Sequence, residues 1–297
     1  MQLSILSFFQ KISNPVLDKL VEFITMFGEE SFFILAIVLI LWCIDKKRGF
    51  AIFSSLFCAL VGMGILKAIL KVPRPFQVSD KISGKRISTA TGYSFPSGHS
   101  TGAGSFYSAL ALSYKKQVIS IIGAVLIAIV GLSRLYLGVH WPLDVFGGIV
   151  LGITVSFALY TFFENYYEKY PIWPIGAVAT VAAFVLSFLI SKKSIDIVGF
   201  TDLTKLLALA GGGYLGFALE QKYINYVIEG SLVKKGIRFI IGFVVLLAIQ
   251  ASKKVFGPSM LVTFLRYWGI GLWVTFIYPV IGSKIKSKKG VPLFSIN

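Results

Sequence analysis

The sequence contains only two histidines, His99 and His140, and both stand beside long apolar segments. Asp144 follows His140 by four residues, so the two side chains share a helix face if a helix has begun by then. From there the carboxylate can accept the Nδ1 proton of the imidazole, which leaves Nε2 free to act as a nucleophile. His99 ends a P-S-G-H turn at the expected start of a helix, where free backbone N–H groups favour a bound anion. These features point to chemistry on a negatively charged group.

Three basic residues accompany the histidines. Lys67 and Arg74 stand where one apolar segment ends, and Arg134 stands where another ends, six residues before His140. Each cation alone is typical of a side chain that extends toward a membrane surface, and Asp144 alone is typical of a helix cap. Together, the cations, the amide-rich turn and the histidines predict a pocket for a phosphate group.

The composition shows what kind of protein must position these residues. Of the 297 residues, 56% are hydrophobic and 14% are charged, whereas a soluble domain carries about 25% charged residues. This excludes a disordered chain or a disulfide scaffold and predicts an integral membrane protein. The formal charge of +16 is assigned to cytoplasmic loops and anionic lipid headgroups, not to nucleic acid.

Apolar segments separated by charges predict an all-α, polytopic bundle of about nine transmembrane helices. Before them, Val16 to Phe27 has apolar residues at helical spacing and predicts an amphipathic helix in the membrane interface, although it could instead extend the first span. The expected domains are this N-terminal helix at 1–30, a core with the polar motifs at 31–170 and additional helices at 171–297. The spans are expected near 31–44, 50–70, 97–114, 117–134, 142–163, 172–191, 203–219, 236–251 and 260–281.

Basic residues in the loops predict the orientation, because Lys and Arg accumulate on the cytoplasmic side. One set of loops holds 14 of these residues and the opposite set holds 6, with the connection from Lys71 to Phe95 left out. The richer set includes the tail residues Lys284, Lys286, Lys288 and Lys289. The N-terminus and the polar motifs are therefore expected outside, and the C-terminus in the cytoplasm.

The polar motifs resemble a known signature. They read K-x6-R-P at Lys67 to Pro75, P-S-G-H at Pro96 to His99, and S-R-x5-H-x3-D at Ser133 to Asp144. In order and spacing they resemble the type 2 phosphatidic acid phosphatase superfamily over residues 30–165. The resemblance implies a helical core with its site at the membrane surface, and removal of phosphate without a metal or another cofactor.

The same resemblance implies a role for each residue. His140 forms a phosphohistidine and Asp144 holds its tautomer, while His99 protonates the leaving oxygen and then activates water. Lys67, Arg74 and Arg134 neutralise the phosphate oxygens, helped by Ser97 and the Gly98 amide. The layout of nine spans resembles glucose-6-phosphatase, whereas smaller members have fewer spans. The additional helices are expected to pack, dimerise or shape a lipid entrance.

The leading prediction is a metal-independent phosphatase of a bacterial cell membrane, acting at the outer face. Its substrate is a lipid phosphate or diphosphate of the polyprenyl diphosphate, phosphatidylglycerophosphate or phosphatidic acid type, and its other partners are membrane lipids. Alternatives are phosphotransfer to an acceptor hydroxyl, hydrolysis of a soluble sugar phosphate, and a lipid or ion transporter. Transport is disfavoured because the charges cluster at one membrane face rather than at the midplane. Metal-dependent hydrolysis is disfavoured because no ligand set is visible. The oligomeric state stays open.

Overall fold

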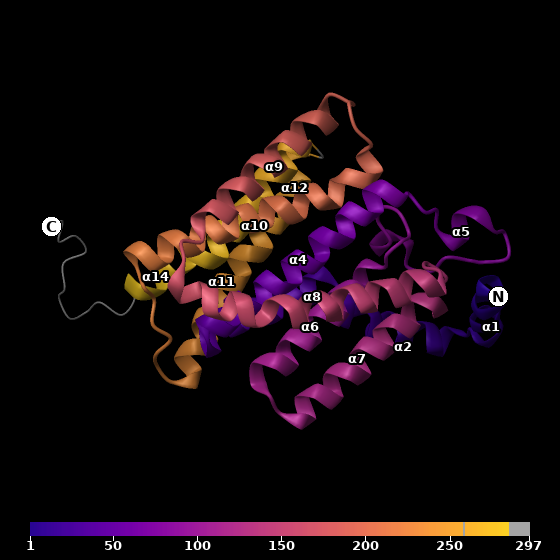
Figure 1. The fold of residues 1–297 in the computed structure, drawn as a ribbon, viewed down its shortest axis with the longest axis horizontal. Coiled ribbons are helices and arrows are strands. Elements are labelled where there is room, and N and C mark those ends of the chain that lie inside the picture. Colours follow the sequence, from indigo (N-terminus) through magenta and orange to yellow (C-terminus); the bar gives the residue numbers. More distant parts are fainter. Residues whose placement is uncertain (258, 285–297) are drawn as a thin grey trace.

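The structure is a computed structural model that describes residues 1–257 and 259–284, and every regular element in these ranges is helical. Long helices run roughly alongside one another, and α1 and α14 lie at opposite ends of the molecule (Figure 1). The all-α class is therefore confirmed. The elements are α1 (Gln2–Ile12), α2 (Pro15–Thr25), η1 (Met26–Gly28), α3 (Glu30–Leu39), η2 (Ile40–Ile44), α4 (Lys46–Leu70), α5 (Pro75–Val78), η3 (Ile87–Thr89), α6 (Gly98–Tyr114), α7 (Gln117–Tyr136), α8 (Pro142–Lys169), α9 (Trp173–Ser191), α10 (Ile197–Tyr223), α11 (Leu232–Ala251), α12 (Lys253–Phe256), α13 (Met260–Leu272), η4 (Trp273–Ile277) and α14 (Tyr278–Lys284).

Within the described ranges, five helical segments are long and apolar enough to cross a membrane. A sixth arises if two helical segments bent by 51° against each other, Pro15–Gly28 and Glu30–Ile44, count as one span. The other expected spans, 97–114, 203–219 and 236–251, are helical as α6, α10 and α11 but do not meet this condition. The count of nine crossings and the side of each terminus stay predictions. The five segments are Lys46–Val78, Gln117–Tyr136, Pro142–Tyr167, Trp173–Ser191 and Met260–Gly282.

The segment Val16 to Phe27, expected as an amphipathic helix, is helical as α2 and η1, and a separate helix, α1, precedes it before a break at Ser13 and Asn14. The break has a local cause, because Asn14 caps α2 and Pro15 occupies its first position. The Asn14 side chain accepts hydrogen bonds from the backbone N–H groups of Val16 at 3.1 Å and Leu17 at 3.0 Å. Both helices pack against α7, so this segment belongs to the wall of the helical core.

Small residues allow the core helices to pack with their backbones in contact. α4, α6, α7 and α8 pack on one another, and α9, α10 and α13 form a second group that meets the first through α4 and α10. The spacing of Gly148 and Gly152 predicts close packing, and a Cβ at Gly152 would lie 2.3 Å from the Thr101 carbonyl of α6. A Cβ at Gly212 would lie 1.9 Å from the Trp268 carbonyl of α13. These glycines therefore allow the close approach of α8 to α6 and of α10 to α13.

The two helix groups are also joined by polar contacts. At one end, Lys46 Nζ lies 3.0 Å from both carboxylate oxygens of the buried Glu220. The buried Trp42 indole donates a hydrogen bond to the Val274 carbonyl at 2.8 Å. The later helices therefore hold the first half of the chain in place.

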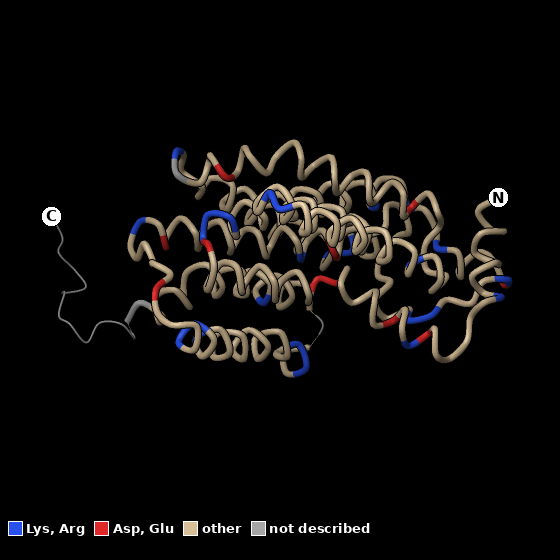
Figure 2. Tube along the Cα trace, turned by 90° about the horizontal axis from the view of Figure 1, so that it is seen from below, with Lys and Arg blue, Asp and Glu red and all other residues tan. Residues whose placement is uncertain are grey.

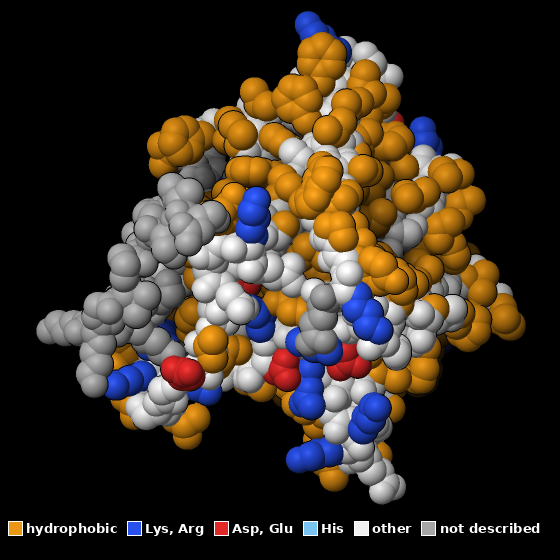
Figure 3. Space-filling model, turned by 60° about the vertical axis from the view of Figure 1, so that its left-hand side comes forward, with side chains coloured by type: hydrophobic (Ala, Val, Ile, Leu, Met, Phe, Trp, Pro, Cys, Tyr) orange, Lys and Arg blue, Asp and Glu red, His pale blue; other side chains and the backbone are white. Residues whose placement is uncertain are grey.

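Charged residues lie mostly near the ends of the helices, as a membrane protein requires (Figure 2). The face at the C-terminal end gathers several Lys and Arg side chains with a few acidic ones, between flanks of hydrophobic side chains (Figure 3). The tail residues Lys286, Lys288 and Lys289 lie outside the described ranges.

Candidate active site

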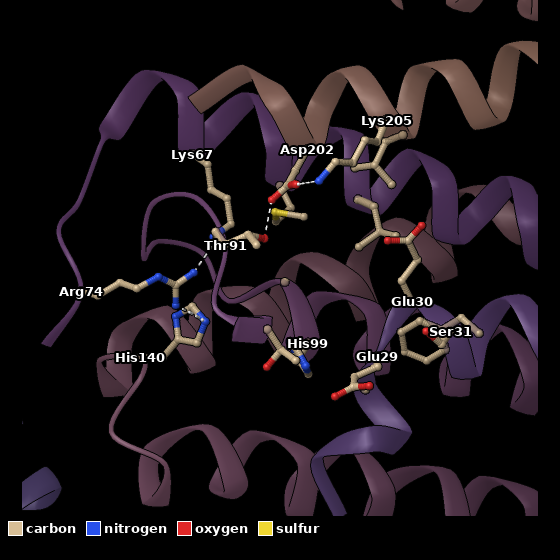
Figure 4. A pocket seen from close by; sticks show the side chains of 17 residues that line it. Glu29, Glu30, Ser31, Lys67, Arg74, Thr91, His99, His140, Asp202 and Lys205 are labelled. Carbon is tan, nitrogen blue, oxygen red and sulfur yellow. Dashed lines mark hydrogen bonds and ion pairs between the residues drawn. The ribbon is translucent and has the colours of Figure 1, made fainter. Parts of the chain in front are cut away.

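Several helix ends meet around a cavity of about 290 Å³. Lys67 comes from the last turn of α4, Arg74 directly precedes α5, and His140 lies in the turn before α8. Gly98 and His99 begin α6. These five of the eight expected site residues line the cavity, whereas Ser97, Arg134 and Asp144 do not. Figure 4 shows Lys67, Arg74, His99 and His140 in one part of the pocket.

Local backbone features place these residues. α4 ends at Lys71, which adopts the left-handed conformation with φ of 49°, two residues before Pro73. After α7 the chain turns at Gly138, where φ is +68° and a Cβ would lie 2.8 Å from the Ser83 carbonyl. Only glycine fits such a position without strain. The turn brings His140 to the N-terminus of α8.

His140 is held on both sides of its imidazole. Its Nε2 lies 3.1 Å from Nη1 of Arg74, and because a guanidinium only donates, this nitrogen must be the acceptor. The proton then resides on Nδ1, which lies 3.4 Å from Oδ2 of Asp144 and 3.4 Å from the Ser94 hydroxyl. The tautomer with a free lone pair on Nε2 is the one a nucleophile needs.

Asp144 is a buried residue whose carboxylate has two partners besides His140 and whose backbone carbonyl has a third. Its Oδ2 accepts hydrogen bonds from the Ser94 hydroxyl at 2.5 Å and from the Trp141 backbone N–H at 2.7 Å. Its own carbonyl accepts the Ser97 backbone N–H at 2.9 Å. The residue therefore joins the turn before α6 to the start of α8. Ser94 was not anticipated, since nothing in its spacing relates it to Asp144.

Backbone carbonyls orient Arg74. Its guanidinium donates to the carbonyls of Thr91 at 2.6 Å, Gly92 at 3.1 Å and Val139 at 2.8 Å. The Tyr93 carbonyl accepts from Arg74 at 3.4 Å and also from the buried Lys67. The segment Thr91 to Tyr93 thus positions both cations. Its only signal in the sequence is Gly92, which here takes a φ of +65°.

Burial and neighbouring positive charge both lower the pKa of His140, which lies in the turn between α7 and α8. Burial lowers the pKa of His140 well below its ordinary value of 6.5, and the Arg74 guanidinium lowers it further. The imidazole is therefore neutral at physiological pH and keeps its lone pair.

Two buried groups near the cavity have nitrogens without a protein partner in the described part of the chain. Arg134 donates from Nη1 to the Thr25 hydroxyl at 2.8 Å, but its Nε and Nη2 have no partner there. The same holds for His99 Nε2. Leaving a buried polar group unpaired costs about 1–3 kcal/mol, so such groups are typical of a site that binds a ligand. Ser97, by contrast, uses its hydroxyl to cap α6 and accepts from Ser100.

The far wall of the cavity comes from α10, in the second half of the chain. Asp202 accepts the Thr91 hydroxyl at 2.6 Å and lies 2.7 Å from Lys205 Nζ, and all three residues line the cavity. Nearby, Tyr93 donates its hydroxyl to Asp196 at 2.8 Å. Sequence reasoning assigned no site residue to this region.

The fold and the site together define a polytopic helical membrane protein with a cationic pocket suited to phosphate. In the described ranges, no group of three or more His, Cys, Asp or Glu side chains is placed to hold a metal ion. Comparison with known families agrees with this class. Residues 48–168 match the PAP2 superfamily, and residues 204–290 match the PAP2 superfamily phosphatase, transmembrane extension. The chain belongs to the PAP2 superfamily, as its motifs predict.

The names of three relatives indicate three different lipid substrates. Phosphatidylglycerophosphatase B of Bacillus subtilis is 42% identical over 82 residues, which cover 25% of this chain and 40% of the relative. Undecaprenyl-diphosphatase of Sulfolobus acidocaldarius is 32% identical over 142 residues, or 48% and 68% of the two chains. Human sphingosine-1-phosphate phosphatase 2 is 27% identical over 219 residues, or 71% and 54%. The chain thus spans between 40% and 68% of these relatives' lengths.

Proposed function

We propose that this protein is a membrane phosphatase that hydrolyses a lipid phosphate or diphosphate through a phosphohistidine on His140. The observation that carries the proposal is the pairing at His140, whose Nε2 accepts from Arg74 while its Nδ1 faces Asp144. This is a neutral nucleophile already in contact with the cation that would bind the phosphate. The relatives, whose names cover a glycerophospholipid, a polyprenyl diphosphate and a sphingoid phosphate, support a lipid substrate.

The reaction follows from the geometry in two steps. In the first, Arg74 releases Nε2 and binds a phosphate oxygen, and the Nε2 lone pair forms a bond to phosphorus. The bond from phosphorus to the lipid oxygen breaks, and that oxygen takes a proton from His99, which must therefore enter this step as the imidazolium. In the second, water gives its proton back to His99 and attacks phosphorus, which releases inorganic phosphate and frees His140.

The basic residues would stabilise the negative charge on the phosphate oxygens. Phosphoryl transfer depends mainly on positioning and on neutralising the oxygens of the transferred group. Lys67 and Arg74 line the cavity, and two nitrogens of the buried Arg134 have no partner in the described part of the chain. The Gly98 N–H, at the start of α6, adds a donor at a helix N-terminus. Ser97 supports the turn through its cap and does not need to touch the phosphate.

The test of the activity is phosphate release by the purified protein with EDTA present. The panel contains polyprenyl diphosphate, phosphatidylglycerophosphate, phosphatidic acid and glucose-6-phosphate. Release from the lipids, undiminished by EDTA and absent in His140→Ala, is the expected result. Preference for glucose-6-phosphate would replace the lipid by a soluble sugar phosphate, and a requirement for metal would overturn the mechanism.

The side of the membrane has its own test. We propose that the active site faces outside, because the loops at the opposite end carry more Lys and Arg. A cysteine placed between Val78 and Gly92 is expected to react with an impermeant thiol reagent in intact cells. One placed beside Lys115 is expected to be protected, and the reverse labelling would place the site in the cytoplasm.

A further inference from the structure

The catalytic cavity carries opposite charges at its two ends. Lys67, Arg74 and His140 lie on one side of His99, and the carboxylate of Glu30 lies on the other (Figure 4). The proposed reaction uses the first of these ends for the phosphate. The second end lines the same cavity, and the reaction gives it no role.

Three carboxylates lie at the second end, and two of them are paired. Glu29 accepts a hydrogen bond from Arg86 at 2.5 Å, and Asp202 lies 2.7 Å from Lys205 Nζ. Glu30 differs from both. In the described part of the chain its carboxylate has no hydrogen bond and no ion pair, although Lys205 acts on it from a longer distance. One carboxylate at this end therefore lacks a direct partner.

The place of Glu30 in the fold explains its position but not its lack of a partner. It begins α3, and the first turn of a helix favours an acidic side chain. Its side chain is exposed and lines the cavity, with Ser31 beside it. Arg266 also acts on the carboxylate electrostatically from a longer distance. Neither influence occupies the carboxylate oxygens, so these are available to a ligand.

The proposed mechanism decides which part of a substrate reaches Glu30. In phosphoryl transfer the attacking and leaving atoms lie roughly in line, so the leaving oxygen is on the side of the phosphate away from His140. His99, the proposed proton donor to that oxygen, lies between His140 and Glu30 in Figure 4. The first carbons of the leaving alcohol therefore extend toward Glu30.

We propose that Glu30 binds an ammonium group on the leaving alcohol, so that the preferred substrate is a lipid monophosphate with an amine close to its phosphate. The inference rests on the proposed function. A carboxylate and an ammonium form a strong, charge-assisted hydrogen bond. A lipid diphosphate fits this end less well, because its leaving group is itself an anion and would lie against a like charge.

A matched pair of substrates tests the inference: octadecyl phosphate and 2-aminooctadecyl phosphate in micelles of a neutral detergent. The amine also changes the acidity of the alcohol, so the decisive quantity is the ratio of the two kcat/KM values in each protein. In Glu30→Gln the preference for the amino substrate is expected to fall about tenfold relative to wild type. Glu22→Gln is the matched control, because it removes a carboxylate of α2 that does not line the cavity, and it should keep the wild-type ratio.

Charge reversal sharpens the test. Glu30→Lys is expected to lower the preference for the amino substrate further and to raise kcat/KM for octadecyl diphosphate relative to octadecyl phosphate, because a lysine would attract the second phosphate. A wild-type ratio in Glu30→Gln, or the same fall in Glu22→Gln, would overturn the inference.

Binding by the wild-type protein covers variants that fail to fold. The probes are the two corresponding phosphonates, in which carbon replaces the ester oxygen and no bond can be hydrolysed. The amino phosphonate is expected to bind about tenfold more tightly, and equal affinities would overturn the inference. If the wild-type protein released phosphate from no substrate, the proposed function would fail, while the phosphonate affinities would still decide whether the cavity prefers an amine.

Discussion

The contact between Thr91 and Asp202 is expected to matter for turnover although neither residue touches His140. Asp202 accepts the Thr91 hydroxyl at 2.6 Å, and the Thr91 carbonyl accepts Arg74 at 2.6 Å. Removing the hydroxyl loosens the carbonyl that orients the guanidinium. A hydrogen bond to a charged group contributes about 1.5–3 kcal/mol, but Thr91 is exposed, so about 1 kcal/mol is the better value. That corresponds to about fivefold in kcat/KM.

A double-mutant cycle isolates this contact, because Asp202 also pairs with Lys205. Thr91→Val and Asp202→Ala are each expected to lose about fivefold or more in kcat/KM, and the double variant should lose no more than the worse single variant. Thr201→Val is the matched control, since its hydroxyl bonds only the Ile197 carbonyl on its own helix. Losses that multiply in the double variant would show that the residues act independently. A full effect of Thr91→Val in an Arg74→Ala background would also refute the reasoning.

Three further outcomes follow from the site. His140→Ala should abolish both turnover and the phosphoenzyme, whereas Asp144→Asn should be less severe; near-normal activity of His140→Ala would refute the nucleophile. Because the pKa of His140 is held well below 6.5, the neutral form persists as pH falls. The loss of kcat/KM by its protonation is then expected below pH 6.5, after correction for the substrate phosphate, whose second pKa is about 6. His99→Ala should lose more of the single-turnover burst with a lipid phosphate, whose alcohol needs a proton, than with p-nitrophenyl phosphate; equal losses would remove His99 from the acid role.

The clustering of the motif residues could be predicted because each motif is a short, local sequence pattern. The polar motifs stand at the ends of apolar segments, so segments that cross a membrane must place them at its surface. The structure brings Lys67, Arg74, His99 and His140 to one cavity accordingly. The roles of these residues stay predictions. The break between α1 and α2 had a visible signal in Asn14 and Pro15, which was not used.

The remaining features depend on tertiary contacts that leave no pattern in the sequence. Backbone carbonyls position Arg74, and any residue type supplies a carbonyl. Asp202 reaches the cavity only because α10 packs on α4. Ser97, whose help in binding phosphate stays a prediction, accepts the Ser100 N–H and so caps α6, a second use that the motif alone does not reveal.

The hydrogen bonds of Trp42 and Lys46 to the later helices have a consequence for how the chain is synthesised and folded. All eight expected site residues have been made by Lys169, yet the acceptor for the buried Trp42 indole is the Val274 carbonyl, about a hundred residues later. At about 5–20 residues per second of synthesis, these hundred residues take some 5 to 20 seconds, during which Trp42 has no acceptor from the later helices. Hydrocarbon offers no substitute hydrogen bonds in that interval. The first half therefore stays incomplete until the last helices arrive, and a ribosome that stalls after Lys169 leaves the motif residues without Asp202 and Lys205, which line the far wall of the cavity.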